Sequence, residues 1–84
     1  MMANENIVKK VVDYIVTQIV EDTSSVSVDI KQESEDSVVI EVRTAEQDMG
    51  RVIGKRGRVA RAIRNVAQAA AEEEGLSASA EFID

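Results

Sequence analysis

Two glycines, Gly54 and Gly57, stand between two stretches of sequence whose apolar residues recur at helical spacing. Glycine adopts backbone angles that other residues avoid and lets a second backbone come close, so the pair predicts a tight turn between two helices. The helix before the turn is short, and its apolar positions are Ala45, Met49, Val52 and Ile53. The helix after the turn extends to about Glu74, with Val59, Ile63, Val66, Ala67 and Ala70 on one face and Arg58, Arg61 and Arg64 opposite.

The first third of the chain predicts a further helix, followed by a hairpin. Asn4 can cap a helix that the polar segment Glu21–Ser25 ends. Alternation over Val26–Ile30 and again over Val38–Val42 predicts two strands, joined by a polar turn at Glu33–Ser37. The apolar face of the helix consists of Ile7, Val8, Val11, Val12, Ile15 and Ile19.

Two further patterns complete the order of elements. Thr44 followed by Gln47 is a capping-box pattern that opens the short helix. Gly75 ends the long helix, and Leu76–Ile83 alternates weakly as a last strand. The order is therefore α-β-β-α-α-β, and the helical crossover allows the second and third strands to lie parallel. Residues 1–84 are expected to form one α+β domain, a three-stranded mixed sheet covered by three helices.

The composition argues against most catalytic and membrane functions. Without cysteine there is no thiolate chemistry, and without histidine the commonest general base and metal ligand are missing. A site made of carboxylates alone remains open among the sixteen acidic residues, but most acids of this kind are solvated surface groups. The longest apolar runs are only three residues, and the segment "MMANENIVKK" lacks the long apolar core of a secretory signal. We expect a noncatalytic cytoplasmic domain that uses no cofactor and no metal.

The charge is segregated along the chain. The net charge is −6, yet six of the ten basic residues lie between Arg51 and Arg64, where no acidic residue occurs. The remaining four basic residues stand against all sixteen acids, a balance of −12. The total therefore hides one positive region that can attract an anion while the rest of the molecule repels it.

The turn at Gly54–Gly57 combines this positive charge with free backbone N–H groups. The start of a helix presents such groups together with the positive end of its dipole, which suits a phosphate. Lys55 and Arg56 add charge at the tip of the turn. The same residues also fit a plain helix cap with solvated arginines, and the acid-free window favours the anion site over that reading. A nucleotide P-loop is excluded, because Gly-x-x-x-x-Gly-Lys-Ser/Thr does not occur.

The run "VIGKRGRVARAI", Val52 to Ile63, resembles the core motif of KH domains, in which Gly-x-x-Gly clamps about four nucleotides. The order of elements is similar to the type II arrangement of that family. The length, the acidity and the run "GRVIGKRGR" resemble the small standalone bacterial KH proteins of the KhpA type. The resemblance covers nearly the whole chain, Asn4 to Asp84, and is specific over Gly50 to Ile63.

The resemblance implies single-stranded RNA as the ligand, in the manner of an RNA chaperone. Phosphates would lie over the Gly-x-x-Gly turn, and bases would meet a groove lined by Val52, Ile53, Val59 and residues of the last strand such as Ser77 and Ser79. Aromatic platforms are not required, and we expect Tyr14 to pack within its helix. The nucleic-acid-binding residues carried over from the motif and its basic flanks are Gly54, Lys55, Arg56, Gly57, Arg51, Arg58, Arg61, Val52, Ile53 and Val59.

Modest affinity from one groove and the resemblance together imply a second module. That module would be another copy, in a homodimer, or a Jag-type KH-containing protein connected with cell shape and cell division. Two rival functions remain open. One is a helix-turn-helix DNA binder in which Arg58, Arg61 and Arg64 read the major groove. The other is a protein-interaction module that uses the Ala-rich segment 62–71 and the arginines.

Overall fold

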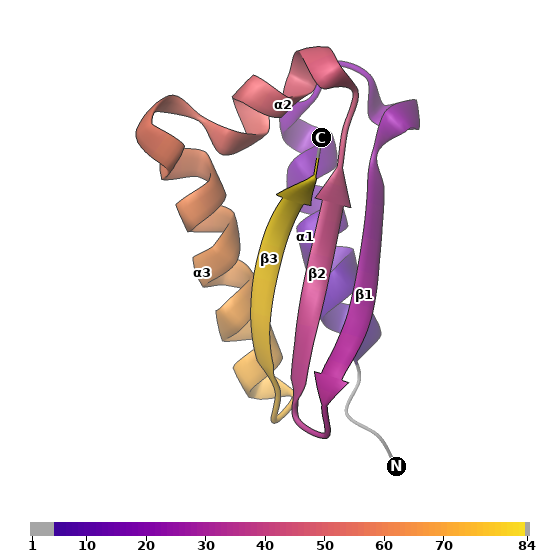
Figure 1. Cartoon of the computed structure of the whole chain (residues 1–84), viewed down its shortest axis with the longest axis vertical. Helices are drawn as coiled ribbons and strands as arrows, with labels where there is room; N and C mark the ends of the chain where they lie inside the picture. The colour runs from indigo at the N-terminus through magenta and orange to yellow at the C-terminus, as the bar shows by residue number, and fades with distance from the viewer. Residues whose placement is uncertain (1–4, 84) are drawn as a thin grey trace.

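The computed structural model of the chain describes residues 5–83 and confirms the expected α-β-β-α-α-β order (Figure 1). The predicted Asn4 cap lies outside the described residues. Two short 3-10 turns, η1 (Thr23–Ser25) and η2 (Lys55–Gly57), interrupt the connections. The longer elements are α1 (Glu5–Ile19), β1 (Ser27–Ser34), β2 (Ser37–Arg43), α2 (Glu46–Ile53), α3 (Arg58–Glu73) and β3 (Ser77–Ile83).

The three strands form one mixed sheet in the order β1-β2-β3. β1 and β2 pair antiparallel, with Ile30 opposite Ile40, and β2 and β3 pair parallel, with Ile40 opposite Ala80. The hairpin turn is shorter than predicted, because Glu33 and Ser34 continue β1 past an irregularity between Gln32 and Ser34. The polar composition predicted where the turn lies but not where the strands end. The last residues of β1 are exposed on both faces, so they show no alternation of apolar and polar residues.

The core lies between one face of the sheet and the helices α1 and α3 (Figure 1). A stripe of valines at every fourth residue, Val8, Val12 and Val16, is completely buried on α1. Ala67 and Ala71 of α3 are also completely buried, and such small residues let α3 approach α1 closely. The Ala-rich segment is therefore divided: Ile63, Ala67 and Ala71 belong to the core, whereas Ala62, Val66 and Ala69 are exposed.

Two local predictions are wrong. Tyr14 does not pack within its helix but is 66% exposed. Thr44 does not cap α2: the N-cap is Ala45, and the Thr44 hydroxyl donates to the Ala45 carbonyl instead. The capping box fails because the helix starts one residue later, which places Asp48 rather than Gln47 at the third helical position.

The side chain of Asp48 joins α2 to the end of α1. It is only 1% exposed, and its two carboxylate oxygens accept the backbone N–H groups of Glu21 and Asp22 at 3.1 and 3.0 Å. Both of these groups follow the last residue of α1. The buried carboxylate therefore fixes the position of α2, and with it the turn that α2 leads into.

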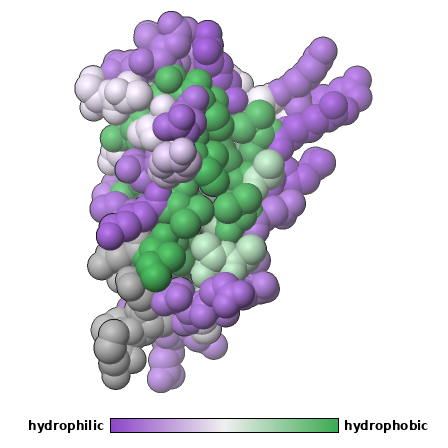
Figure 2. All heavy atoms as spheres, turned by 180° about the vertical axis from the view of Figure 1, so that it is seen from behind, coloured by the Kyte–Doolittle hydropathy of each residue, from purple (hydrophilic) through white to green (hydrophobic). Residues whose placement is uncertain are grey.

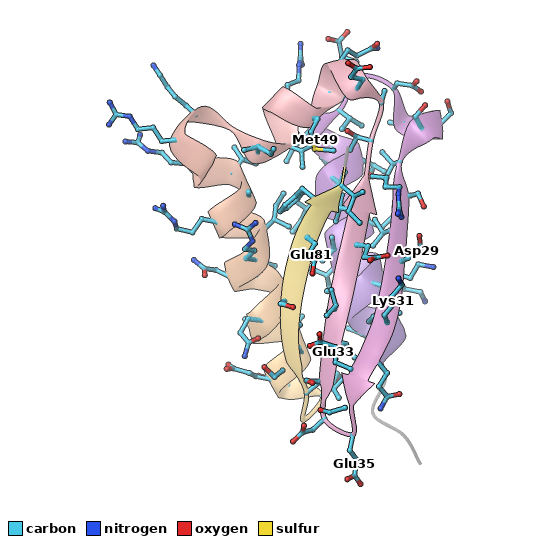
Figure 3. All side chains as sticks on the ribbon, in the orientation of Figure 1. Asp29, Lys31, Glu33, Glu35, Met49 and Glu81 are labelled. Atoms are coloured by element: carbon cyan, nitrogen blue, oxygen red, sulfur yellow. The ribbon has the colours of Figure 1, made fainter. Side chains whose placement is uncertain are left out.

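The opposite face of the sheet carries charged side chains rather than a covering layer. Figure 3 shows Asp29, Lys31 and Glu81 on this face. Lys31 pairs with Glu41 of β2 at 3.3 Å, and Arg43 lies 3.6 Å from Asp29. Within residues 5–83, no helix is long and apolar enough to cross a membrane.

Candidate nucleic-acid interface

The turn between α2 and α3 is held by its own backbone hydrogen bonds. The N–H of Gly54 donates to the Gly50 carbonyl at 2.9 Å, and the N–H of Gly57 donates to the Gly54 carbonyl at 3.1 Å. The N–H of Arg58 then donates to the carbonyl of Lys55. The first bond ends α2, and the other two make a single 3-10 turn of Lys55–Gly57, with Lys55 and Arg56 exposed at its tip.

Gly54 occupies a conformation that only glycine adopts readily. Its φ of 77° and ψ of 171° lie in a region that side chains exclude. There is also no space for a side chain, because an added Cβ would lie 2.9 Å from the backbone nitrogen of Val59. The close approach of α3 to the end of α2 therefore depends on this glycine.

The next residues turn the backbone in the left-handed region. Arg56 has a φ of 57° and a ψ of 25°, which costs a residue with a side chain about 1 kcal/mol or more. Gly57 follows with a φ of 71° and a ψ of 16° and forms the N-cap of α3. The N–H groups of Gly57 and Arg58 are already bonded within the turn, so the attraction for an anion here comes from the positive end of the α3 dipole and from the exposed cations. No side chain caps this end of α3.

Four basic side chains around the turn are exposed and have no acidic partner within 4 Å among residues 7–83: Lys55, Arg56, Arg58 and Arg61. Arg51 differs from them, because its guanidinium donates to the carboxylate of Glu21 at 2.6 Å. The segment from Arg51 to Arg64 contains no acidic residue, but in the folded protein the carboxylate of Glu21 lies beside it. Glu21 was missed because it lies thirty residues away in the chain, and no local pattern connects the two side chains.

The apolar residues predicted for the groove are placed differently from one another. Val52 is completely buried and offers no surface to a ligand, so it can only support the turn from below. Ile53 is 38% exposed at the end of α2. Val59 is half-buried, covers Gly54 and faces α1 rather than β3. Ser77 and Ser79 are exposed on the uncovered face of the sheet.

The side of α3 that lies along β3 carries two polar contacts that the sequence did not reveal. The Nε of Arg64 donates to the carbonyl of Ala80 at 3.2 Å, and its guanidinium carbon lies 5.3 Å from the ring centre of Phe82. One turn further on, the side-chain oxygen of Gln68 accepts the N–H of Ala78 at 2.8 Å. Both contacts satisfy backbone groups on the outer edge of β3.

A concave surface lies on the helical side of the sheet. It is a groove of about 290 Å³ between α1 and α3, lined by Ile15, Ile19, Arg58, Val59, Ala62, Ile63 and Val66. Apolar side chains gather on this side of the molecule, with long hydrophilic side chains projecting beside them (Figure 2). Ile7 and Val66 are each about two-fifths exposed here, so the apolar faces of both helices are wider than the core requires.

The comparison with known protein families agrees with this geometry. The family model described as "KhpA/KhpB, KH domain" matches residues 9–82, which includes every element from α1 to β3. The chain belongs to the KhpA/KhpB family of KH domains. The strained turn at Gly54–Gly57 is the Gly-x-x-Gly loop of this KH domain.

Relatives from several bacteria match about nine-tenths of the chain. An RNA-binding protein KhpA from Clostridium perfringens is 39% identical over 75 residues, 89% of this chain and 99% of that protein. Its counterpart from Borreliella burgdorferi is 33% identical over 75 residues, 89% of this chain and 90% of that protein. The one from Aquifex aeolicus is 34% identical over 76 residues, 90% and 95% of the two chains. No solved structure matches the chain significantly.

Proposed function

We propose that this KH domain binds single-stranded RNA without catalysing a reaction, and that it holds the phosphate backbone at the Gly-x-x-Gly loop. The observation that carries this proposal is the strained turn itself. An arginine with left-handed backbone angles lowers stability, and residues in such conformations are often found at ligand sites. Here the strain exposes two cations and leaves the start of α3 without a side-chain cap.

The predicted site residues divide into three roles under this proposal. Gly54 and Gly57 shape the backbone, and the positive end of the α3 dipole attracts a phosphate. Lys55, Arg56, Arg58 and Arg61 supply the positive charge. Ile53 and Val59 offer apolar surface close to the turn, Val52 supports them from the core, and Arg51 contributes only when Glu21 releases it.

The helix-turn-helix alternative is less favoured by the geometry. A recognition helix must present its side chains outward to reach base edges in the major groove. Arg64, one of the three arginines required for that reading, is held beside the edge of β3 by its bond to Ala80 and its contact with Phe82, so the sheet rather than a DNA duplex lies along that side of α3. The relatives that cover this chain are also named as RNA-binding proteins.

A double substitution tests the proposal. Replacing Lys55 and Arg56 together by Asp should abolish RNA binding, because two attractive charges beside a phosphate become repulsive. Each unit-charge contact at about 4 Å is worth roughly 1 to 4 kcal/mol, depending on the local dielectric. Both side chains are exposed, so the thermal melting curve should be unchanged. Fluorescence anisotropy with labelled RNA measures binding, and undiminished affinity in a natively folded double variant would refute the proposal.

We also propose that the domain works in the cytoplasm as part of a larger assembly, with a second copy or a Jag-type KH protein, as an RNA chaperone connected with cell shape and division. The groove between α1 and α3 supports an assembly, because it leaves apolar surface open on the side away from the charged face of the sheet. An occupant there adds a second RNA-binding module and so raises the effective concentration of the first.

Light scattering across a range of concentrations should show a dimer that Val66→Glu converts to a monomer. The added charge lies in the groove and opposes burial of its apolar walls. Asn65→Glu is the matched control, since it adds the same charge to an exposed neighbour outside the groove. A monomer at all concentrations that binds RNA tightly without any partner would show that the assembly proposal is wrong.

A further inference from the structure

Arg64 is the one basic side chain between Arg51 and Arg64 whose guanidinium is fixed against the sheet. Its Nε donates to the Ala80 carbonyl at 3.2 Å, and the Phe82 ring lies 5.3 Å from its central carbon. These two contacts set the direction of the guanidinium before any ligand arrives. A side chain that is already ordered loses less conformational entropy when it binds.

The fixed guanidinium retains unused donors. Arginine has five N–H groups, and among the side chains that the structure describes, residues 7–83, and the backbone of residues 5–83, only the one on Nε has a partner. No carboxylate of residues 7–83 lies within 4 Å of this guanidinium. The remaining N–H groups, on Nη1 and Nη2, therefore present a fork of two parallel donors. Such a fork matches a pair of adjacent acceptors, as in a phosphate or on the O6–N7 edge of guanine.

The position of Arg64 favours a base over a phosphate. It lies seven residues after Gly57, which is about 10 Å along the axis of α3. The four free cations near the loop already serve the phosphates there. Arg64 instead lies where α3 runs along the edge of β3 (Figure 1), and an unstacked base of single-stranded RNA is read on its edges.

Gln68 lies one turn after Arg64 on the same side of α3, and its side chain already has partners. Its amide oxygen accepts the Ala78 N–H at 2.8 Å, and its amide nitrogen donates to Glu72 at 3.0 Å. One donor and one acceptor of that side chain are thus already used, whereas the Nη groups of Arg64 have no partner among the described side chains. We propose that Arg64 recognises one guanine base of the bound RNA through O6 and N7. This inference rests on the proposed RNA binding and adds a base preference to it.

Labelled uridine octamers test the preference by fluorescence anisotropy with the whole protein. One RNA contains only uridine, a second carries a single internal guanine, and a third carries 7-deazaguanine, which lacks the N7 acceptor. The guanine RNA should bind more tightly than the uridine RNA by about 5- to 150-fold, the discrimination of one bidentate contact. Most of that gain should disappear with 7-deazaguanine. Equal binding of all three RNAs by the unaltered protein overturns the inference.

Two variants assign the preference to this side chain. Arg64→Gln and Arg64→Lys should both bind the three RNAs with similar affinity, because lysine keeps the charge but not the fork. If either variant keeps the guanine preference, another group reads the base and the inference is wrong. If Arg64→Gln weakens all three RNAs equally and flattens the salt dependence, Arg64 contacts a phosphate and the inference is also wrong.

The outcome for the uridine RNA separates this inference from the proposed function. If that RNA binds and the Lys55, Arg56 double variant abolishes its binding, the proposed function stands whatever the guanine result. If no RNA binds the unaltered protein, both proposals fail together. Thermal melting of the two Arg64 variants checks that the fold persists, and the 7-deazaguanine comparison needs no variant at all.

Discussion

At the scale of single residues, Gly54 combines two constraints at one position. Its backbone angles belong to glycine, and the backbone of Val59 stands where a side chain would go. Gly50, one turn earlier in α2, has neither constraint: its φ is not positive and nothing lies within 4 Å of an added Cβ. Two glycines of the same motif region therefore differ in what they contribute.

Substituting these two glycines by alanine should have opposite effects on stability. Gly54→Ala should lower the free energy of unfolding by about 1 to 3 kcal/mol from backbone strain alone, and the overlap with Val59 adds to this. Gly50→Ala should raise it by about 0.4 to 1 kcal/mol, because alanine restricts the unfolded chain and suits a helix. Urea unfolding measures both changes. Equal stability of the two variants would show that α3 does not need the close approach at Gly54.

Sequence reasoning found the residues whose role depends on near neighbours and missed those whose partners are far away in the chain. The glycine turn and the cations at its tip follow from a dozen consecutive residues. The pairing of Arg51 with Glu21 and the contact of Arg64 with Ala80 join residues thirty and sixteen positions apart. Such contacts depend on how the elements pack, so the spacing of apolar residues within one element does not predict them.

At the scale of elements, the type and order of the helices and strands were predictable because each has a regular apolar spacing. Their ends were less predictable, since ends depend on tertiary contacts. The hairpin turn narrowed to two residues once the register of β1 and β2 was set. The start of α2 moved past Thr44 because the carboxylate of Asp48 binds the end of α1 instead of leaving Gln47 to close a capping box.

Removing this carboxylate should loosen the connection between α1 and α2. Asp48→Ala leaves the backbone N–H groups of Glu21 and Asp22 without their acceptor in a partly buried site. The expected loss is about 1 to 3 kcal/mol in the free energy of unfolding. Gln47→Ala, at the exposed neighbour, should change it by about 0.5 kcal/mol or less. Thermal unfolding followed by circular dichroism compares the two, and similar melting temperatures would contradict the bridging role.

At the scale of the whole molecule, the segregation of charge along the sequence becomes a segregation in space. The uncovered face of the sheet carries carboxylates such as Asp29 and Glu81, and the loop at the far end of α2 carries the free cations (Figure 3). A polyanion is repelled by the first surface and attracted by the second, so the net charge of −6 does not oppose RNA binding. The segregation of charge could be predicted from the sequence, but the pairing of Arg51 with Glu21 could not.

The salt dependence of RNA binding tests this electrostatic arrangement. Contacts to two or three phosphates should give a slope of about −1.4 to −2.1 for the logarithm of affinity against the logarithm of salt concentration. Glu21→Gln frees Arg51 for a further phosphate, so it should raise affinity at low salt and steepen the slope by about 0.7. Glu46→Gln removes the same charge from an exposed position in α2 without freeing Arg51, and its slope should match that of the unaltered protein. Anisotropy titrations at four salt concentrations measure all three slopes. If both variants raise affinity equally, the overall field rather than the Arg51–Glu21 pair governs binding, and a flat slope in the unaltered protein would remove the phosphate contacts altogether.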